Sequence, residues 1–193
     1  VNVFSGFNQP YDVSFVPQYE ALCGITDEEI DTFFSEDVDE LAETNGTTSE
    51  SIRCTLRKLY DGYHFSAKLT NIYNPFSLFN VFATKTLRDF WFSTGTPLYL
   101  VRLLSGGQIN ISDLLSDNYE QSFFTDNSMD DGNPLPILYQ SGYLTVKDII
   151  SRDGDFPLYR LDYPNLEVKR GFVSMLCNDY FEASENVMNI TNK

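Results

Sequence analysis

The spacing of hydrophobic residues changes along the chain, and this change constrains the fold most. In the first half, hydrophobic residues recur every three to four positions, which is typical of helices that bury one face. In the second half, residues 143–150 and 158–163 alternate hydrophobic and polar side chains on either side of a Ser-Arg-Asp-Gly-Asp turn, which predicts a β-hairpin. The expected fold class is therefore α+β and mostly helical.

Local signals mark where helices start and stop. Thr26 to Glu29 form a capping-box pattern, in which hydroxyl and carboxylate each accept a hydrogen bond from a free amide at the helix start. Asn74-Pro75 and Thr96-Pro97 mark two further helix starts, and Asn45-Gly46 and Asp61-Gly62 mark helix ends. The predicted helices run over 26–45 and 47–61, from 74, from 96, over 134–140 and from 164. In the helix predicted over 26–45, the hydrophobic residues at helical spacing are Ile30, Phe33, Phe34, Val38 and Leu41.

Charge is distributed unevenly and suggests a division into parts. No Lys or Arg precedes Arg53, and residues 27–50 carry ten carboxylates. Residues 112–131 are acidic again and rich in Asn and Asp. The predicted organisation is a helical lid-like region at 1–111, an acidic linker at 112–133, a winged-helix-like unit of helix, hairpin and helix at 134–185, and a tail at 186–193.

Composition narrows the class of protein. The chain has 28 acidic and 13 basic residues, a net charge of -15, which disfavours binding to nucleic acids or anionic membranes. No hydrophobic run approaches the roughly 20 residues of a membrane helix. Three widely spaced cysteines, Cys23, Cys54 and Cys177, fit buried, reduced thiols. Together with the lack of a recognisable secretory signal, these features predict a cytoplasmic protein.

The sequence offers few parts for catalysis. There is no Walker A loop to hold phosphates, and His64 is the only histidine, so a Ser-His-Asp triad would have to use it. Asp126, Ser128 and Asp130 follow the spacing of a calcium loop, but Ile137 stands where the last carboxylate ligand belongs, which favours a solvated acidic loop. We therefore expect no catalytic, metal-binding or nucleic-acid-binding residues in this chain.

One spacing indicates a different chemistry. Glu167 and Lys169, with Asp153 and Asp155 upstream, resemble the acid-x-Lys element of restriction-type nucleases, in which carboxylates hold a metal ion. That element belongs on a strand, whereas here a helix is predicted. The favoured interpretation is a glutamate at a helix start, stabilised by the helix dipole, with Lys169 and Arg170 as surface charge that suits a protein partner better than DNA.

Six short phrases, taken together, resemble one known family. They are Phe4-Ser5-Gly6-Phe7-Asn8, Tyr60-Asp61-Gly62-Tyr63-His64-Phe65, Tyr73-Asn74-Pro75-Phe76-Ser77-Leu78, Trp91-Phe92-Ser93-Thr94-Gly95-Thr96-Pro97, Gln140-Ser141-Gly142-Tyr143-Leu144-Thr145 and Tyr163-Pro164-Asn165-x-Glu167-Val168. In this order they resemble the C-terminal half of the bacterial AAA-ATPase-like proteins, which are P-loop ATPases often followed by a nuclease-like domain. The resemblance runs from the first residue to about Phe181.

The resemblance implies the lid and winged-helix part of such an ATPase without its phosphate-binding core. The Walker A, Walker B and sensor elements of the family lie upstream of the first phrase, and the nuclease-like domain lies downstream of the last. ATP and Mg2+ are thus implied as cofactors of a full-length member, and none for this chain. The implied partners are the upstream P-loop ATPase domain and, where present, the downstream nuclease-like domain.

Several polar side chains are candidates for contact with a nucleotide. Asp61 and His64 would form a polar pair; the alternative is a helix-ending Asp-Gly turn with the imidazole hydrogen-bonded beneath aromatic rings. Arg57 and Arg102 would supply a cation to the γ-phosphate; the alternative is an ordinary surface role. The same two interpretations apply to Arg53, Lys58 and Arg88. The residues expected in the core are Trp91, Phe92, Tyr139 and Tyr143.

The leading hypothesis is a non-catalytic portion of an AAA-ATPase-like protein that positions a nucleotide or a partner domain and does not hydrolyse ATP alone, since hydrolysis needs a phosphate-binding loop and a Mg2+ site. A free-standing protein-interaction module is the alternative. A metal-dependent nuclease is a weaker one.

Overall fold

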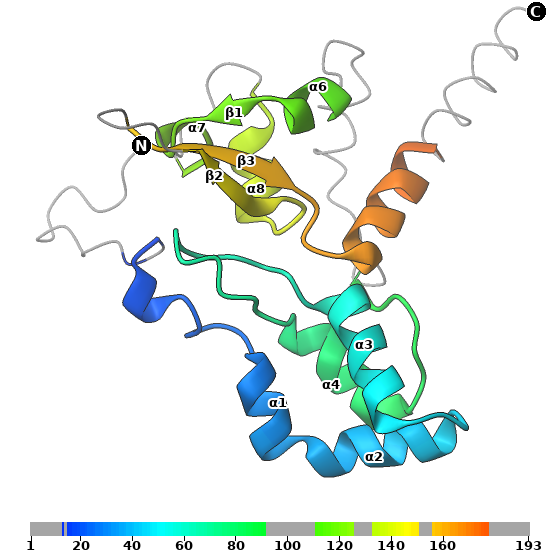
Figure 1. Ribbon diagram of the computed structural model, residues 1–193. Coiled ribbons are helices and arrows are strands. Elements are labelled where there is room, and N and C mark those ends of the chain that lie inside the picture. The colour runs from blue at the N-terminus through cyan, green and yellow to red at the C-terminus, as the bar shows by residue number, and fades with distance from the viewer. Residues whose placement is uncertain (1–12, 14, 92–110, 126–132, 151–155, 178–193) are drawn as a thin grey trace, which may run out of the picture.

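The structure, a computed structural model, describes residues 13, 15–91, 111–125, 133–150 and 156–177. It contains two units, a helical unit and a hairpin unit, which lie one above the other in Figure 1. The fold is α+β and mostly helical, as the sequence predicts.

The helical unit is built from a short 3-10 helix and four α-helices. Its elements are η1 (Pro17–Tyr19), α1 (Asp27–Phe33), α2 (Ser35–Thr44), α3 (Ser49–Tyr60) and α4 (Pro75–Thr84). The predicted capping box is present, because the Thr26 hydroxyl accepts from the Glu29 amide at 3.2 Å and the Glu29 carboxylate accepts from the Thr26 amide at 2.8 Å. At the starts of α3 and α4, the side chains of Thr48 and Asn74 accept hydrogen bonds from backbone N–H groups, without the reciprocal carboxylate contact. The predicted start at 96 lies outside the described residues.

The first predicted helix is two helices. Phe34 leaves helical geometry, with φ -127° and ψ 16°, and separates α1 from α2. Its ring stacks on Phe82 of α4 at 5.6 Å and lies 5.9 Å from Phe79. This packing accounts for the bend, and the bend leaves Phe33 outside with 71% of its surface exposed. Phe33, expected at helical spacing with Ile30 and Leu41, therefore does not share their buried face.

The hairpin unit is a small antiparallel sheet with short helices around it. Its elements are α6 (Ile111–Ser116), β1 (Asn118–Tyr119), α7 (Ser122–Thr125), α8 (Leu135–Gln140), β2 (Thr145–Ile150) and β3 (Leu158–Asp162), followed by helical residues 166–177. The strand order is β1-β3-β2, and β2 and β3 form the predicted hairpin.

Much of the expected acidic linker is folded. Within 112–133, Asn118 pairs with Arg160 and Tyr119 with Tyr159, which adds β1 to the sheet. Phe124 is fully buried in the core of the hairpin unit. The acidic composition of residues 112–133 favoured the prediction of a linker, although the stretch also contains the buried aromatic residues Tyr119 and Phe124. Residues 126–132 lie outside the described part of the chain.

The two units have separate cores, and the chain passes between them more than once. One core lies among α1 to α4, and the other surrounds the sheet. Tyr63 and Ile72, which follow α3, pack in the second core with the sheet. Leu166 packs against the first core, whereas Val168 and Phe172 of the same helix lie in the second. The segments 61–73 and 163–168 therefore tie the units together.

The cysteines differ from expectation. Cys23, Cys54 and Cys177 are all free, but each is exposed rather than buried. On α3 the inward positions are taken by larger hydrophobic residues such as Ile52 and Leu56, and Cys54 falls on the outward face. No helix in the described ranges is long and apolar enough to cross a bilayer.

Gly62 is predicted to tolerate an added side chain much less well than Gly46 does. It has φ +96°, and an added Cβ would collide with Pro164 O and lie 2.9 Å from Lys147 Nζ. Gly46 also has positive φ, +63°, but an added Cβ there meets nothing within 4 Å. We expect Gly62→Ala to lower the free energy of unfolding by at least about 2 kcal/mol more than Gly46→Ala, because only Gly62 adds a backbone collision to the conformational strain. Urea denaturation of both variants measures this, and equal losses would refute it.

Candidate functional site

The phrases that carry the resemblance meet at the junction of the two units. Parts of five of the six lie within the described residues, and the first lies outside them. Contacts join residues 60–65 to β2, residues 73–78 to the helix over 166–177, and Trp91 to Tyr143. This junction, made by segments distant in sequence, is the candidate site.

His64 is buried and fixes the end of α3 against β2. Its backbone N–H donates to Thr145 Oγ1 at 2.9 Å, and that hydroxyl donates back to His64 O at 3.0 Å. Nδ1 lies 2.5 Å from Val146 O, and because a carbonyl only accepts, Nδ1 carries the proton in this contact. Nε2 lies 2.6 Å from Oδ1 of Asn71. Both ring nitrogens are thus engaged within the protein, which favours the structural interpretation of His64.

Lys147 connects the units through its side chain. Its ammonium donates to Gly62 O at 2.6 Å and to Pro164 O at 2.8 Å. The β2–β3 register shifts between Val146 and Asp148, which makes Lys147 the extra residue of a bulge. A bulge redirects a side chain, and here the lysine is directed across the junction. Burial lowers the pKa of Lys147 despite the nearby carboxylates.

Asp61 is a buried carboxylic acid with incomplete hydrogen bonding. The Gly62 N–H donates to its carboxylate, but Oδ1 has no hydrogen-bond partner among the described residues. Burial raises the pKa of Asp61, and the Gly62 N–H and the charge on Lys147 offset this only in part. Both Asp61 and His64 lie in the junction, but no hydrogen bond joins their side chains.

Glu167 is fully buried and holds residues 90 and 91 in place. Its Oε1 accepts from the backbone N–H groups of Phe90 and Trp91, the latter at 2.9 Å, and its Oε2 accepts from Ser77 Oγ at 2.7 Å. Burial raises its pKa, and these hydrogen bonds counteract the effect without cancelling it. The helix start after Asn165 is confirmed, since Asn165 Oδ1 accepts from the Val168 N–H at 3.1 Å.

A pocket of about 550 Å³ opens at the same junction. Aromatic rings from both units line it, together with the exposed Cys23 and Leu22. Tyr19 comes from η1, Tyr63 and Phe65 come from the segment that links the units, and Trp91 follows α4. The hairpin unit contributes Tyr139, Gly142 and Thr145. Trp91 and Tyr143 meet edge to face at 4.8 Å beside it. Its size and its aromatic lining suit a flat apolar group or side chain.

The candidate cations lie apart from this pocket or outside the described residues. Arg57 is held by a bidentate pair with Asp27, with Nη2 2.5 Å from Oδ2, and this hydrogen bonding raises the pKa of Arg57. Arg53, buried on the same helix, contacts Asp27 at 2.9 Å and Asp31 at 2.8 Å. Lys58 is exposed, and Arg88 lies over the Phe90 ring. Arg102 lies outside the described residues.

Asp27 anchors these arginines, a role that its position in the sequence does not indicate. Besides the arginines it accepts from Tyr73 Oη at 2.8 Å. Burial alone would raise its pKa, but the hydrogen bonds from Arg57 and Tyr73 outweigh burial and lower it. The sequence marked Asp27 only as the first residue of a capped helix. The role of Lys147 was also missed, because the alternating pattern of a strand does not show where the strand has a bulge.

The described residues do not assemble a nuclease centre. No group of three or more His, Cys, Asp or Glu side chains among them is placed to hold a metal ion. Glu167 lies on a helix, not a strand, and both its oxygens already accept hydrogen bonds. Lys169 is exposed and lies over the Tyr163 ring. Asp153 and Asp155 are outside the described part of the chain.

Comparison with known proteins gives one informative match. The "Uncharacterized protein in vnfD 5'region" of Azotobacter chroococcum mcd 1 is 34% identical over 191 residues. The match covers 99% of this chain but 34% of the relative, so the chain spans about a third of the length of that protein. No protein family and no solved structure matches the chain.

Asp61 is predicted to make stability depend on pH. A raised pKa means that the folded state binds the proton more tightly, so the stability it contributes is present below its ordinary pKa of 3.8 and is lost as pH rises through the raised value. Asp61→Asn removes this loss. We expect the variant to gain stability relative to the native chain between pH 4 and pH 7, in urea denaturation. Exposed Asp113→Asn is the control, and a difference that stays constant with pH would contradict the prediction.

Two substitutions of Glu167 are predicted to behave differently. Glu167→Gln keeps one oxygen for the Phe90 and Trp91 amides, and its NH2 can donate to Ser77, so most stability should remain. Glu167→Ala leaves two amides without an acceptor and should cost about 2–4 kcal/mol. Chemical denaturation compares them, with exposed Glu43→Ala as control. A metal-binding role requires the carboxylate, so loss of metal-dependent DNA cleavage in Glu167→Gln with unchanged stability would support the nuclease instead.

Proposed function

We propose that this chain is the non-catalytic lid and winged-helix portion of a cytoplasmic AAA-ATPase-like protein, and that it positions a nucleotide or a partner domain. One observation carries the proposal: the parts of these phrases that lie within the described residues meet at a single junction, where His64, Lys147 and Glu167 join the units. A segment that must hold a fixed shape between larger domains needs a junction of this kind.

The length of the curated relative supports the same proposal. The match covers 34% of that protein, which leaves room for further domains. In the proposed arrangement an upstream P-loop ATPase domain supplies the ATP and Mg2+ sites, a nuclease-like domain can follow, and this chain supplies neither site. Arg102 remains the candidate cation toward the nucleotide, since Arg57 is paired with Asp27.

A free-standing protein-interaction module is the second candidate. The pocket at the junction favours it, because its aromatic walls and the 73% exposed Leu22 suit the capture of an apolar side chain. The module would bind its partner with no neighbouring ATPase domain.

Nucleotide binding tests the leading proposal. The chain alone should show no saturable binding of Mg-ATP in calorimetry up to millimolar concentration, because it lacks a phosphate-binding loop. The complete endogenous polypeptide, detected in a lysate of the source cells with an antibody to this chain, should be much larger than 22.1 kDa and should bind Mg-ATP. Saturable binding by the chain alone, or an endogenous mass near 22.1 kDa, would contradict the proposal.

A further inference from the structure

The outer face of α4 is apolar where an exposed helix is normally polar. Phe76 is 44% exposed and Phe79 is 50% exposed, one helical turn apart. The inner face, formed by Ser77, Leu78, Val81 and Phe82, is already buried in the unit. The ten residues of α4 include no charged side chain, in contrast to α1, α2 and α3.

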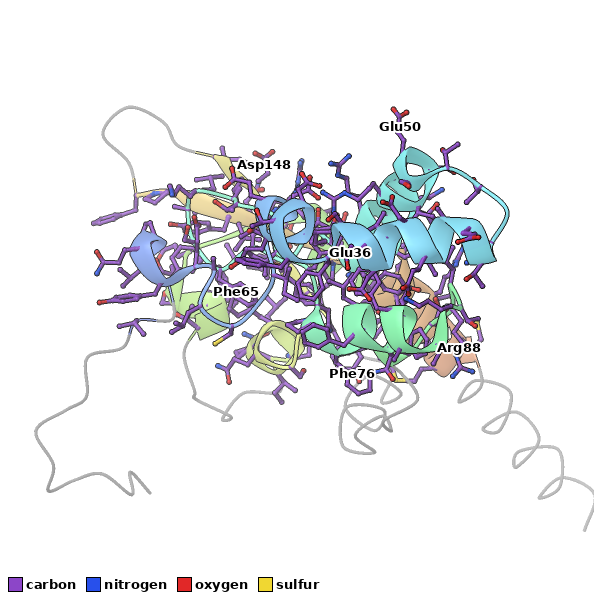
Figure 2. The ribbon with its side chains drawn as sticks, turned by 90° about the horizontal axis from the view of Figure 1, so that it is seen from below. Glu36, Glu50, Phe65, Phe76, Arg88 and Asp148 are labelled. Atoms are coloured by element: carbon purple, nitrogen blue, oxygen red, sulfur yellow. The ribbon has the colours of Figure 1, made fainter. Side chains whose placement is uncertain are left out.

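The neighbouring helices show what a solvent-facing surface looks like in this protein. The outward positions of α2 include Glu36, Asp39 and Glu40, and those of α3 include Glu50 and Lys58. In Figure 2, Glu50 lies at the top of the view and Phe76 projects from α4 at the opposite edge. A helix that is hydrophobic on every side is usually buried on every side. In α4 only the inner side is buried.

The polar side chains of α4 do not compensate for this. The Asn80 amide donates to Phe76 O at 2.8 Å, and the Thr84 hydroxyl donates to Asn80 O at 2.7 Å. Both groups are therefore turned back onto the helix. Phe34 extends the surface, since its half-buried ring lies 5.9 Å from Phe79. The result is a continuous apolar surface formed by Phe34, Phe76 and Phe79, named here the α4 face.

We propose that the α4 face is the docking surface for a neighbouring domain of a longer polypeptide, through an apolar, uncharged surface of that domain. The inference rests on the proposed function, because it takes the occupant from the same protein. The curated relative supports such an occupant, since about two thirds of that protein lies outside the match.

Charge argues against a second copy of this chain as the occupant. Each copy carries a formal charge of -15, and the acidic helices α1 and α2 lie in the same unit as the α4 face. Two such surfaces brought together would repel each other. A small ligand is also disfavoured, because the pocket is lined by Asn74 but not by Phe76 or Phe79.

Hydroxyl-radical footprinting of the 193-residue chain and of the complete endogenous polypeptide tests the proposal. Exposed phenylalanines are oxidised in proportion to their accessibility. We expect labelling of Phe76 and Phe79 to fall several-fold in the longer polypeptide, while Phe156, 88% exposed on the other unit, serves as internal reference. Unchanged labelling of Phe76 and Phe79 relative to Phe156 would overturn the proposal and leave the proposed function intact. An endogenous mass equal to that of this chain would overturn both.

A matched pair of variants gives a second, independent measurement. Phe79→Ser and Phe156→Ser each remove one exposed ring, and each should change the stability of the chain alone only slightly. In the longer polypeptide, Phe79→Ser should restore several-fold stronger labelling of Phe76, because the docked domain loses a contact at the centre of the interface. Phe156→Ser should leave Phe76 protected. Equal labelling of Phe76 in both variants would refute docking at the α4 face.

Discussion

The ammonium group of Lys147 joins the two segments of the chain that pass between the units of this protein. Lys147 Nζ donates to the carbonyls of Gly62 and Pro164, which belong to the two segments that pass between the cores. Lys147 is half-buried, and a cation withdrawn from water is costly unless its donors are satisfied, so these two carbonyl groups stabilise its position. The bulge in β2 directs the lysine to them, and the lack of a side chain at Gly62 leaves room for the approach.

Other polar groups of the junction also form hydrogen bonds within the protein. His64 and Thr145 exchange hydrogen bonds across the units, and Glu167 joins the last described helix to α4 and to residues 90 and 91. Groups that would serve as acid, base or metal ligand in an enzyme here serve the architecture. Both the pocket and the α4 face have apolar side chains at their surface, which suit apolar contact.

The sequence predicted those parts of the fold that are decided locally. The capping box at Thr26, the Asn74 cap and the hairpin all depend on residues a few positions apart. The break at Phe34 could not be predicted, because it depends on packing against α4, far along the chain. The burial of Glu167 was missed for the same reason, since its three donors lie about 76 to 90 positions away. Polar residues near the site could be identified from the sequence, but not their partners.

The unfolding of the native chain tests most directly whether the junction makes one body of the two units. Trp91 is the only tryptophan, and it lies at the junction, 4.8 Å from Tyr143. Its fluorescence therefore reports the junction, whereas far-ultraviolet circular dichroism reports the helices of both units. If the junction joins the units as described, the two signals will change together in a single urea transition. Loss of the Trp91 signal at a clearly lower urea concentration, with helicity retained, would show that the units separate before they unfold and would contradict this account.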